Sequence, residues 1–372
     1  MIEQIETNLG CSCETYADLR MISKYSIQSR IKLRCYLPLL ASKGESVNNH
    51  DVTKYRMALF MIRNYSGQFF NFITNVSLEG GITTEQLINH ETIAKMIVDI
   101  LYVFGTLGEW CALKLIDMIN RELYDTILLI SKTRSNYLRL LNTCHSTLCS
   151  IRKSILLYLD EGIVTKLQTG SESRLTIQQF LSISAPKLHL LAQVLLEYLE
   201  ELSSPPTHQT SHSSFNFPSN ICSLIYVKNR SMACVLNEWI RELVAITREM
   251  NSGKTNIIEF LQPDHVLLAE DDGKNELKNF YYRKHQKSLH EIFYYRQKEE
   301  TLRRFRLAQQ CNVLITTSMS SEGLDVNRCN IVICFDPPET FHQFIQSKGR
   351  VRVERGQYIV LVEMNDHKEY FR

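Results

Sequence analysis

CNVLITTSMSSEGLDV at residues 311–326, IVICFDPP at 331–338 and QSKGRVR at 346–352 are the three stretches of this sequence that decide its fold. The first is an apolar run followed by hydroxyl, glycine and carboxylate side chains, which predicts a buried strand and a polar loop. The second predicts another buried strand, and the third predicts an arginine-rich helix start. Because ligands bind open α/β sheets at the carboxyl ends of strands, this order predicts one wall of a nucleotide cleft.

The flanking sequence extends this pattern. LIYV at 224–227 and YIVLVE at 358–363 predict further buried strands, and 232–243 has the spacing of an amphipathic helix. Strands that alternate with helices favour a mostly parallel sheet. We therefore predict an α/β fold with a parallel-sheet domain after about residue 221.

The sequence upstream of this domain is helical. Apolar residues recur at helical spacing from about 48 to 201, which predicts an all-α domain whose last helix carries Pro186 in its first turn. Residues 203–220 are polar and interrupted by proline, as in a linker. Residues 1–36 form a lead-in, and the alternation of IKLRCY at 31–36 predicts a strand.

The composition limits the classes of function. The 372 residues are 44% hydrophobic and 22% charged, with a net charge of +2, so any nucleic-acid-binding surface must be local. No signal segment and no run of about eighteen apolar residues occur, so we expect a cytoplasmic protein without a membrane span. The 11 cysteines are scattered and form no Cys-x-x-Cys pair. Neither the group of Cys144, His145 and Cys149 nor the pair of His208 and His212 has the ligand arrangement of a structural zinc site, so we predict no metal.

The loop after the 313–315 strand carries side chains suited to a phosphate-containing ligand. Thr317 and Ser318 can donate hydrogen bonds to a phosphate backbone, and Gly323 permits close approach of a ligand. Asp325 can accept a hydrogen bond from a ribose hydroxyl or orient an arginine. The alternative is an ordinary polar loop, which these residues alone do not exclude.

Two arginines follow this loop closely in sequence. Arg350 and Arg352 have planar guanidinium groups that match phosphate oxygens in a bidentate geometry. Arginines that act in trans can contribute roughly 10³–10⁵-fold to phosphoryl transfer. The alternative is a solvated basic helix start, but the preceding loop at this spacing favours phosphate recognition.

The opposite wall of such a cleft is not encoded in these residues. GKT at 253–255 ends like a phosphate-binding loop, but that pattern requires a glycine where Arg248 stands. No Asp-Glu-x-His or Asp-Glu-x-Asp magnesium box occurs. We therefore expect that the chain does not bind and activate ATP alone.

A basic segment at 281–306 has two interpretations. Its lysines and arginines alternate with aromatic residues, and such a face can follow a phosphate backbone. In the alternative, it is a solvated helix face with Phe293, Tyr294 and Phe305 in the core. The sequence leaves both open.

These stretches resemble the helicase region of Dicer, a ribonuclease III family. Residues 317–325 are similar to motif V of superfamily 2 helicases, and 346–352 are similar to motif VI in the form found in Dicer and RIG-I-like proteins. Residues 224–236 resemble motif IV of Dicer, and VFGTLGEWCALK at 103–114 resembles part of its helicase insertion. The resemblance is strongest to the microRNA-type Dicer of insects. It covers nearly the whole chain, with the motif IV to VI block as its specific part.

The resemblance implies a domain organisation. Residues 1–36 would be the exit segment of a first RecA-like lobe, and 37–205 would be a helical insertion domain. Residues 206–220 would be a linker, and 221–372 would be the C-terminal RecA-like lobe. Because the phosphate-binding loop and the ribonuclease III domains of the family do not occur in this sequence, we expect a fragment of a longer protein or a partial gene model.

The resemblance also implies site residues. Contacts with the RNA backbone would come from Arg230, Thr317 and Ser318. Contacts with ATP would come from Gly323, Asp325, Gln346, Arg350 and Arg352, with the last two as arginine fingers only when a first lobe is present. Mg²⁺ would bind only in the intact parent. Lys348 and Glu354 depart from the family pattern and leave ATP coupling open.

Two functions follow for the chain. In the first, it is the helicase C-terminal part of a Dicer-like endoribonuclease that binds double-stranded or hairpin RNA in microRNA or siRNA processing, without catalysis on its own. In the second, it binds RNA without ATP coupling and docks a double-stranded-RNA-binding partner protein through the helical insertion. A purely structural role for the helical domain is a third interpretation.

Overall fold

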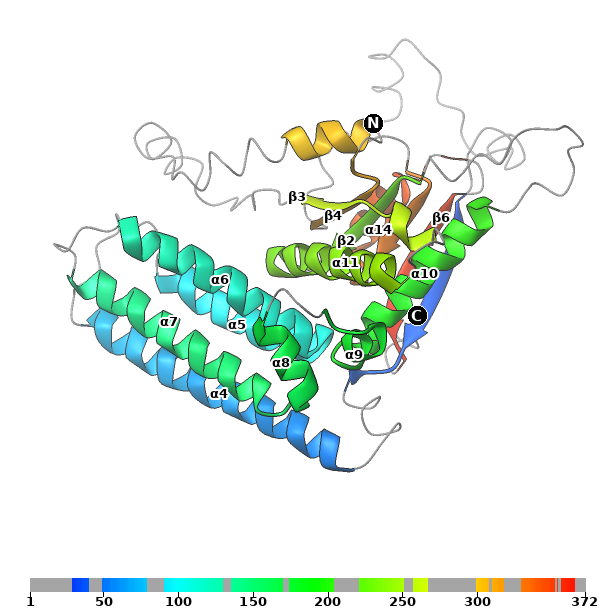
Figure 1. The fold of residues 1–372 in the computed structure, drawn as a ribbon. Helices are drawn as coiled ribbons and strands as arrows, with labels where there is room; N and C mark the ends of the chain where they lie inside the picture. Colours follow the sequence, from blue (N-terminus) through cyan, green and yellow to red (C-terminus); the bar gives the residue numbers. More distant parts are fainter. Residues whose placement is uncertain are drawn as a thin grey trace, which may run out of the picture.

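A parallel β-sheet forms the centre of the molecule's C-terminal half (Figure 1). The computed structural model describes residues 29–39, 49–78, 90–129, 135–169, 174–203, 221–250, 257–266, 299–307, 310–317, 329–351, 353 and 356–364. Its six strands lie in the order β1-β6-β5-β2-β4-β3, and all neighbouring pairs are parallel. They are β1 (Arg30–Tyr36), β2 (Ser223–Val227), β3 (Pro263–Val266), β4 (Val313–Thr317), β5 (Ile331–Cys334) and β6 (Gln357–Glu363).

Helices cover both faces of this sheet, because its central strands are apolar on both sides. One face packs in a shared core with α10 (Pro186–Ser203) and α11 (Arg230–Met250). The other face packs against α14 (Phe341–Lys348) and a helix at 299–306. A short 3₁₀ helix, η1 (Ile257–Phe260), leads into β3. The predicted α/β fold is confirmed.

Between residues 49 and 203, every element that the structure describes is a helix, as predicted. This helical half consists of α4 (Asn49–Leu78), α5 (His90–Leu107), α6 (Glu109–Leu129), α7 (Ser135–Leu156), α8 (Glu161–Thr169) and α9 (Ile177–Ser182), and ends with α10. The four long helices pack side by side, with α4 against α5 and α7, and α6 against the same two (Figure 1). Their apolar stripes supply much of the core.

The turn between α5 and α6 lies close to the backbone of residues 183–185. Gly108 has φ +92, and a Cβ built there would lie 3.0 Å from the Ile183 carbonyl oxygen. The Trp110 N–H donates to that same oxygen at 3.1 Å, and the Ala185 N–H donates to the Leu107 oxygen at 3.0 Å. This turn therefore requires a glycine, which alone adopts that conformation without steric cost.

The strand predicted at 31–36 is present as β1, but its location differs from the sequence-based division of the chain. It was assigned to the exit segment of another lobe, whereas the structure pairs it with β6, from Arg30↔Gln357 to Tyr36↔Glu363. Arg34 also forms an ion pair with Glu197 of α10. Residues 30–36 thus complete the edge of the C-terminal sheet.

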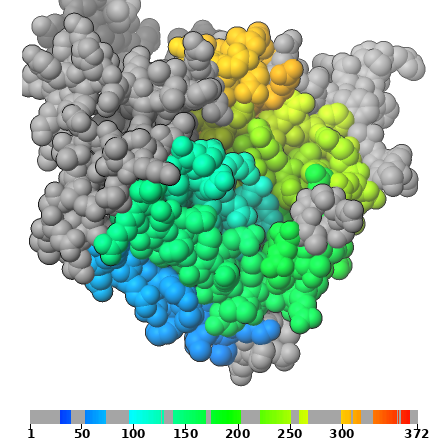
Figure 2. All heavy atoms as spheres, turned by 60° about the vertical axis from the view of Figure 1, so that its left-hand side comes forward, coloured from blue at the N-terminus to red at the C-terminus, as the bar shows by residue number. Residues whose placement is uncertain are grey.

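The helical half and the sheet half share one continuous hydrophobic core. Trp239 of α11 is fully buried and stacks on Phe180 of α9, with ring centroids 5.4 Å apart. Phe180 meets the edge of Trp110 of α6 at 5.2 Å. Seen from the helical side, α6 and α11 form one surface without a gap between them (Figure 2). The two halves are therefore one packed unit.

Across the described parts of the chain, no helix combines the length and apolar character needed to cross a membrane. His145 lies with Nε2 at 3.7 Å from Cys149 Sγ and Nδ1 at 3.1 Å from Asn120 Oδ1. Within those same ranges, no three potential metal ligands gather. His208 and His212 lie outside the described residues.

Candidate nucleic-acid and nucleotide interface

The carboxyl edge of the sheet brings two predicted RNA-binding residues to neighbouring strands. Val227, the last residue of β2, is in register with Thr317, the last residue of β4. Thr317 is buried at 8% exposure. Arg230 follows β2 as the first residue of α11. Since parallel strands end at one edge, Arg230 and Thr317 lie beside the same edge, where α/β sheets bind ligands.

The start of α11 is fixed by its own polar side chains. Asn229 Oδ1 accepts a hydrogen bond from the Met232 N–H at 2.8 Å, as an N-cap residue does. Ser231 Oγ donates to Asp99 Oδ2 of α5 at 2.5 Å. These bonds hold the first turn of α11, including Arg230, in one orientation.

The segment after β5 completes this edge. The backbone N–H groups of Phe335 and Asp336 donate to the Tyr226 carbonyl at 2.9 and 3.4 Å. Asp336 Oδ2 accepts from the Lys228 N–H at 2.7 Å. Thr340 then caps α14 by accepting from the Gln343 N–H at 3.2 Å. The loops after β2 and β5 are therefore bonded to each other.

The helix α14 carries Gln346, with Arg350 just beyond its end. Gln346 is half-buried, and its Nε2 lies 3.1 Å from His342 Nε2. The Arg350 carbonyl accepts from the Cys329 N–H at 3.2 Å, which places its backbone at the amino end of β5. Burial raises the pKa of Tyr226 above its ordinary value, and the positive charge of Arg350 opposes the shift.

The structure thus separates the backbones of the predicted site residues into two places. Arg230 and Thr317 lie at the carboxyl edge of the sheet, whereas the Arg350 backbone lies at the amino end of β5. Gly349, which follows the last residue of α14, has a φ of −61, which is ordinary helical backbone. Four further predicted residues lie outside the described residues: Ser318, Gly323, Asp325 and Arg352.

A buried polar chain that sequence reasoning missed holds α14 on the sheet. Tyr358 of β6 has its hydroxyl 2.8 Å from Ser347 Oγ, and the Cys334 thiol donates to that hydroxyl at 3.0 Å. Ser347 Oγ also donates to the Gln343 carbonyl at 2.7 Å. The sequence signal for this chain was a tyrosine in a strand of mostly aliphatic residues. A buried hydroxyl usually has a hydrogen-bond partner, so a tyrosine at this position implied one.

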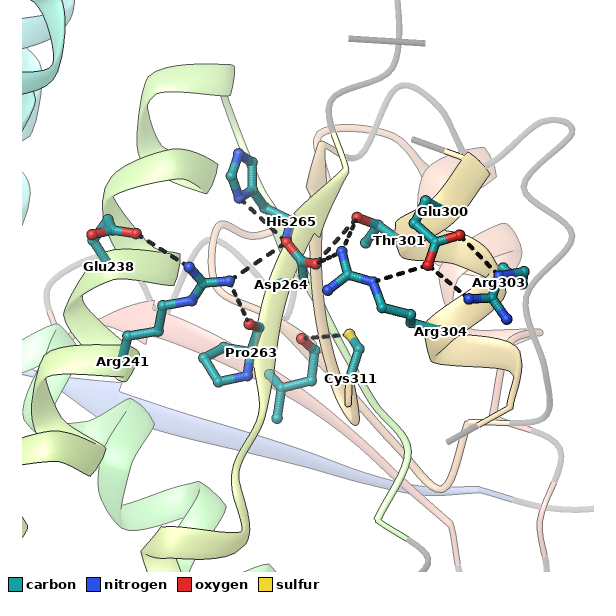
Figure 3. Close-up of polar contacts among 11 residues, drawn as sticks. Glu238, Arg241, Pro263, Asp264, His265, Glu300, Thr301, Arg303, Arg304 and Cys311 are labelled. Carbon is teal, nitrogen blue, oxygen red and sulfur yellow. Dashed lines mark hydrogen bonds and ion pairs between the residues drawn. The ribbon is translucent and has the colours of Figure 1, made fainter. Parts of the chain in front are cut away.

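In the described part of the basic segment, 299–306, arginines form ion pairs with carboxylates of the protein itself (Figure 3). Arg304 donates to Asp264 Oδ2 of β3 at 2.7 Å, and Arg303 donates to Glu300 Oε1 at 2.7 Å. Phe305 is 1% exposed and lies in the core. For these residues the structure favours a packed helix over a phosphate-tracking face. Residues 281–298 lie outside the described residues.

Asp264 is the centre of this network (Figure 3). Its side chain is 5% exposed, and it also accepts from Thr301 Oγ1 at 3.1 Å and from the His265 N–H at 2.8 Å. Arg241 Nη2 of α11 lies 3.9 Å from Asp264 Oδ1 and donates to the Pro263 carbonyl at 3.3 Å. The network therefore fastens the edge strand β3 to the helices on both faces of the sheet.

His265, beside Asp264, makes stability depend on pH. Burial lowers the pKa of its imidazole, while the Asp264 carboxylate opposes this shift and Arg241 reinforces it. Burial likewise lowers the pKa of His189. An unfolded histidine has a pKa of about 6.5, so as pH falls towards that value the unfolded chain binds more protons than the folded chain. The stability is therefore complete above the unfolded pKa and is lost as pH falls towards the folded pKa.

We expect His265→Gln to flatten the fall in the free energy of unfolding between about pH 7 and about pH 5. One such group contributes a slope of up to about 1.4 kcal/mol per pH unit. Urea unfolding at a series of pH values measures this slope. His342→Gln, at an exposed position on α14, is the control and should leave the curve unchanged. Identical curves for His265→Gln and the unmodified chain would contradict the assignment.

Comparison with known proteins gives one family match and several relatives. Residues 236–353 match the helicase conserved C-terminal domain. Endoribonuclease Dicer-S of Xenopus laevis is 26% identical over 99% of this chain, which spans 19% of that protein. Endoribonuclease Dcr-1 of Drosophila melanogaster is 32% identical over 42% of this chain and 6% of its own length. The Hef helicase domain of Pyrococcus furiosus aligns with 100% of this chain and 64% of its own, at 14% identity and a TM-score of 0.39.

Proposed function

Because residues 236–353 are a helicase C-terminal domain, in a chain related to Dicer endoribonucleases over 99% of its length, we propose that this RecA-like lobe binds double-stranded or hairpin RNA. The chain spans about a fifth of the length of the relatives it matches, so their activity is proposed only for a longer protein. In that protein, the lobe would serve microRNA or siRNA processing and would not catalyse a reaction on its own.

The observation that carries the proposal is the register of Val227 with Thr317. It gives Arg230 and Thr317 adjacent positions beside one sheet edge, where a cationic side chain and a hydroxyl suit two points of a phosphate backbone. Ser318 would extend this contact. None of the cysteines that the structure describes forms a disulfide bond, which is the usual state in a reducing compartment such as the cytoplasm.

The ATP role belongs to the same proposal but needs a second lobe. Gln346, Arg350 and Arg352 would face the ATP phosphates, with Gly323 and Asp325 at the border of the nucleotide. The phosphate-binding loop and the Mg²⁺ would come from the first RecA-like lobe. Arg350 at the end of a helix fixed by Ser347 and Tyr358 supports this assignment, because catalytic arginines must be held in place.

Binding of a fluorescein-labelled hairpin RNA, measured by anisotropy at several salt concentrations, tests the proposal. We expect the logarithm of the affinity to fall linearly with the logarithm of salt concentration. Arg230→Ala should weaken binding about three- to tenfold and reduce the salt slope by roughly one phosphate contact. Arg121→Ala, at an exposed position on α6, is the matched control. Equal effects of the two variants, or binding that salt does not change, would contradict the proposal.

Docking of a double-stranded-RNA-binding partner protein on the helical domain is the second candidate function. Exposed apolar residues favour it: Met57 and Phe60 on α4 are 52% and 62% exposed, and Tyr124 and Leu128 on α6 are 57% and 66% exposed. Each pair has the i,i+3 or i,i+4 spacing of one helix face. Loss of partner binding in Phe60→Ser, with RNA binding intact, would distinguish this function from RNA binding.

A further inference from the structure

A buried ion pair connects the helical half of the molecule to the loop that follows β5. Lys187 Nζ of α10 lies 2.7 Å from Asp336 Oδ1, and the two side chains are only 6% and 13% exposed. The other carboxylate oxygen, Asp336 Oδ2, accepts the Lys228 N–H at 2.7 Å. One carboxylate therefore joins a helix, the loop after β5 and the loop after β2.

Aromatic rings enclose the Lys187 ammonium. Its Nζ lies 4.3 Å from the ring centroid of Phe335 and 5.4 Å from that of Tyr36. Cation–π contacts of this kind are stronger where water is excluded. Burial raises the pKa of Tyr102 on α5 to about 12, and the charges of Asp336 and Glu339 add to the shift. The ammonium has few alternative positions in this setting.

The ion pair is close in sequence and in space to the proposed RNA contact. The Lys228 N–H donates to Asp336, and Lys228 is followed by the N-cap Asn229 and then by Arg230. A buried carboxylate that loses its cation carries an uncompensated charge, and the surroundings rearrange to hydrate it. Because the Lys228 N–H donates to the same carboxylate, such a rearrangement acts directly on the loop at 228–230.

We propose that Lys187, through Asp336, is a positioning residue for Arg230, so that the helical domain sets the RNA-binding geometry of the sheet edge. This inference rests on the proposed RNA-binding function. A merely structural pair would lower stability without changing how Arg230 contacts RNA. The two roles differ in one measurable respect: a positioning residue has no effect of its own once Arg230 is removed.

The chain contains a matched control pair across the same contact between halves. Lys114 of α6 lies 3.5 Å from Glu238 of α11, with side chains 38% and 30% exposed. This pair also joins the helical half to the sheet half, but Lys114 contacts neither Asp336 nor the loop at 228–230. Lys114→Met therefore removes one lysine charge, at a more exposed position, while leaving the proposed positioning intact.

The test combines RNA binding with amide hydrogen exchange on the full chain. For Lys187→Met we expect hairpin RNA affinity to fall about three- to tenfold with a salt slope lower by roughly one contact, and no further fall in the Arg230→Ala background. Exchange at residues 228–232 should be faster than in the unmodified chain. Lys114→Met should change neither measurement.

Three outcomes separate the failure of this inference from that of the RNA-binding function. Additive effects of Lys187→Met and Arg230→Ala, or unchanged exchange at 228–232, would overturn the positioning role. If the unmodified chain does not bind RNA, the RNA-binding function is wrong. Hydrogen exchange would then test only whether Lys187 orders the loop at 228–230. If Lys187→Met does not fold, Asp336→Asn replaces it. That variant keeps an oxygen for the Lys228 N–H but removes the charge that Lys187 requires, and the same outcomes apply.

Discussion

Trp239→Ala is expected to lower the free energy of unfolding by about 3–5 kcal/mol, because the change leaves a large cavity in a core that cannot collapse around it. The indole is fully buried, and its Nε1–H donates to Ser184 Oγ at 2.9 Å. It stacks on Phe180, which in turn packs on Trp110. The substitution removes the centre of the contact between the helical half and the sheet half.

Urea unfolding followed by circular dichroism measures this effect, and Trp110 supplies a second probe, since the chain contains only 2 tryptophans. Trp239→Phe is the control. It keeps a ring against Phe180, and Ser184 Oγ keeps its bond to the Phe180 carbonyl at 2.8 Å, so we expect a smaller loss of about 1–2 kcal/mol. Equal losses for both variants would mean that cavity formation is not the cause.

Arg350→Ala is expected to lower RNA-stimulated ATP hydrolysis about 10³–10⁵-fold in a two-lobed protein that contains this chain. Removal of an arginine finger leaves part of the developing phosphate charge unneutralised in the transition state. In the structure, the Arg350 carbonyl accepts a hydrogen bond from the Cys329 N–H, and the contact between Ser347 and Tyr358 holds the preceding helix on the sheet. A preorganised cation of this kind costs little reorganisation when the phosphates arrive.

Turnover by the two-lobed protein at saturating RNA measures this effect. Arg303→Ala is the control, because Arg303 lies on the surface of another helix and forms an ion pair with Glu300. Arg350→Lys tests geometry, since lysine keeps the charge and loses the bidentate fork. Unchanged hydrolysis in Arg350→Ala would remove the ATP role, and the chain would then be an RNA-binding and partner-docking module without ATP coupling.

Local patterns in the sequence were sufficient for the elements of the fold. The strands expected at 31–36, 224–227, 313–315, 331–335 and 358–363 correspond to β1, β2, β4, β5 and β6, and Pro186 begins α10 as expected. Short apolar runs predict buried strands because each residue in a parallel sheet is covered on both faces. The strand order was not predicted, and β1 beside β6 joins segments more than three hundred residues apart.

The candidate site was predictable only in part, for the same reason. The end of β4 was identified because a polar loop after an apolar strand marks the carboxyl edge of a sheet. Arg303 and Arg304 were counted with a basic surface, but Glu300 and Asp264 neutralise them in the fold. Asp264 comes from β3, so composition within the helix could not reveal that pairing.

By itself, the sequence determined the class of fold, the split into a helical half and a parallel-sheet half, and the kind of chemistry the sheet's edge suits. These follow from periodicity and from side-chain types, which are local properties of the chain. Only the tertiary structure decided which charges stay available to a ligand and which are held by the protein. Lys187 and Asp336, 149 positions apart, show why: a buried ion pair depends on where two distant segments meet, and no local pattern encodes that meeting.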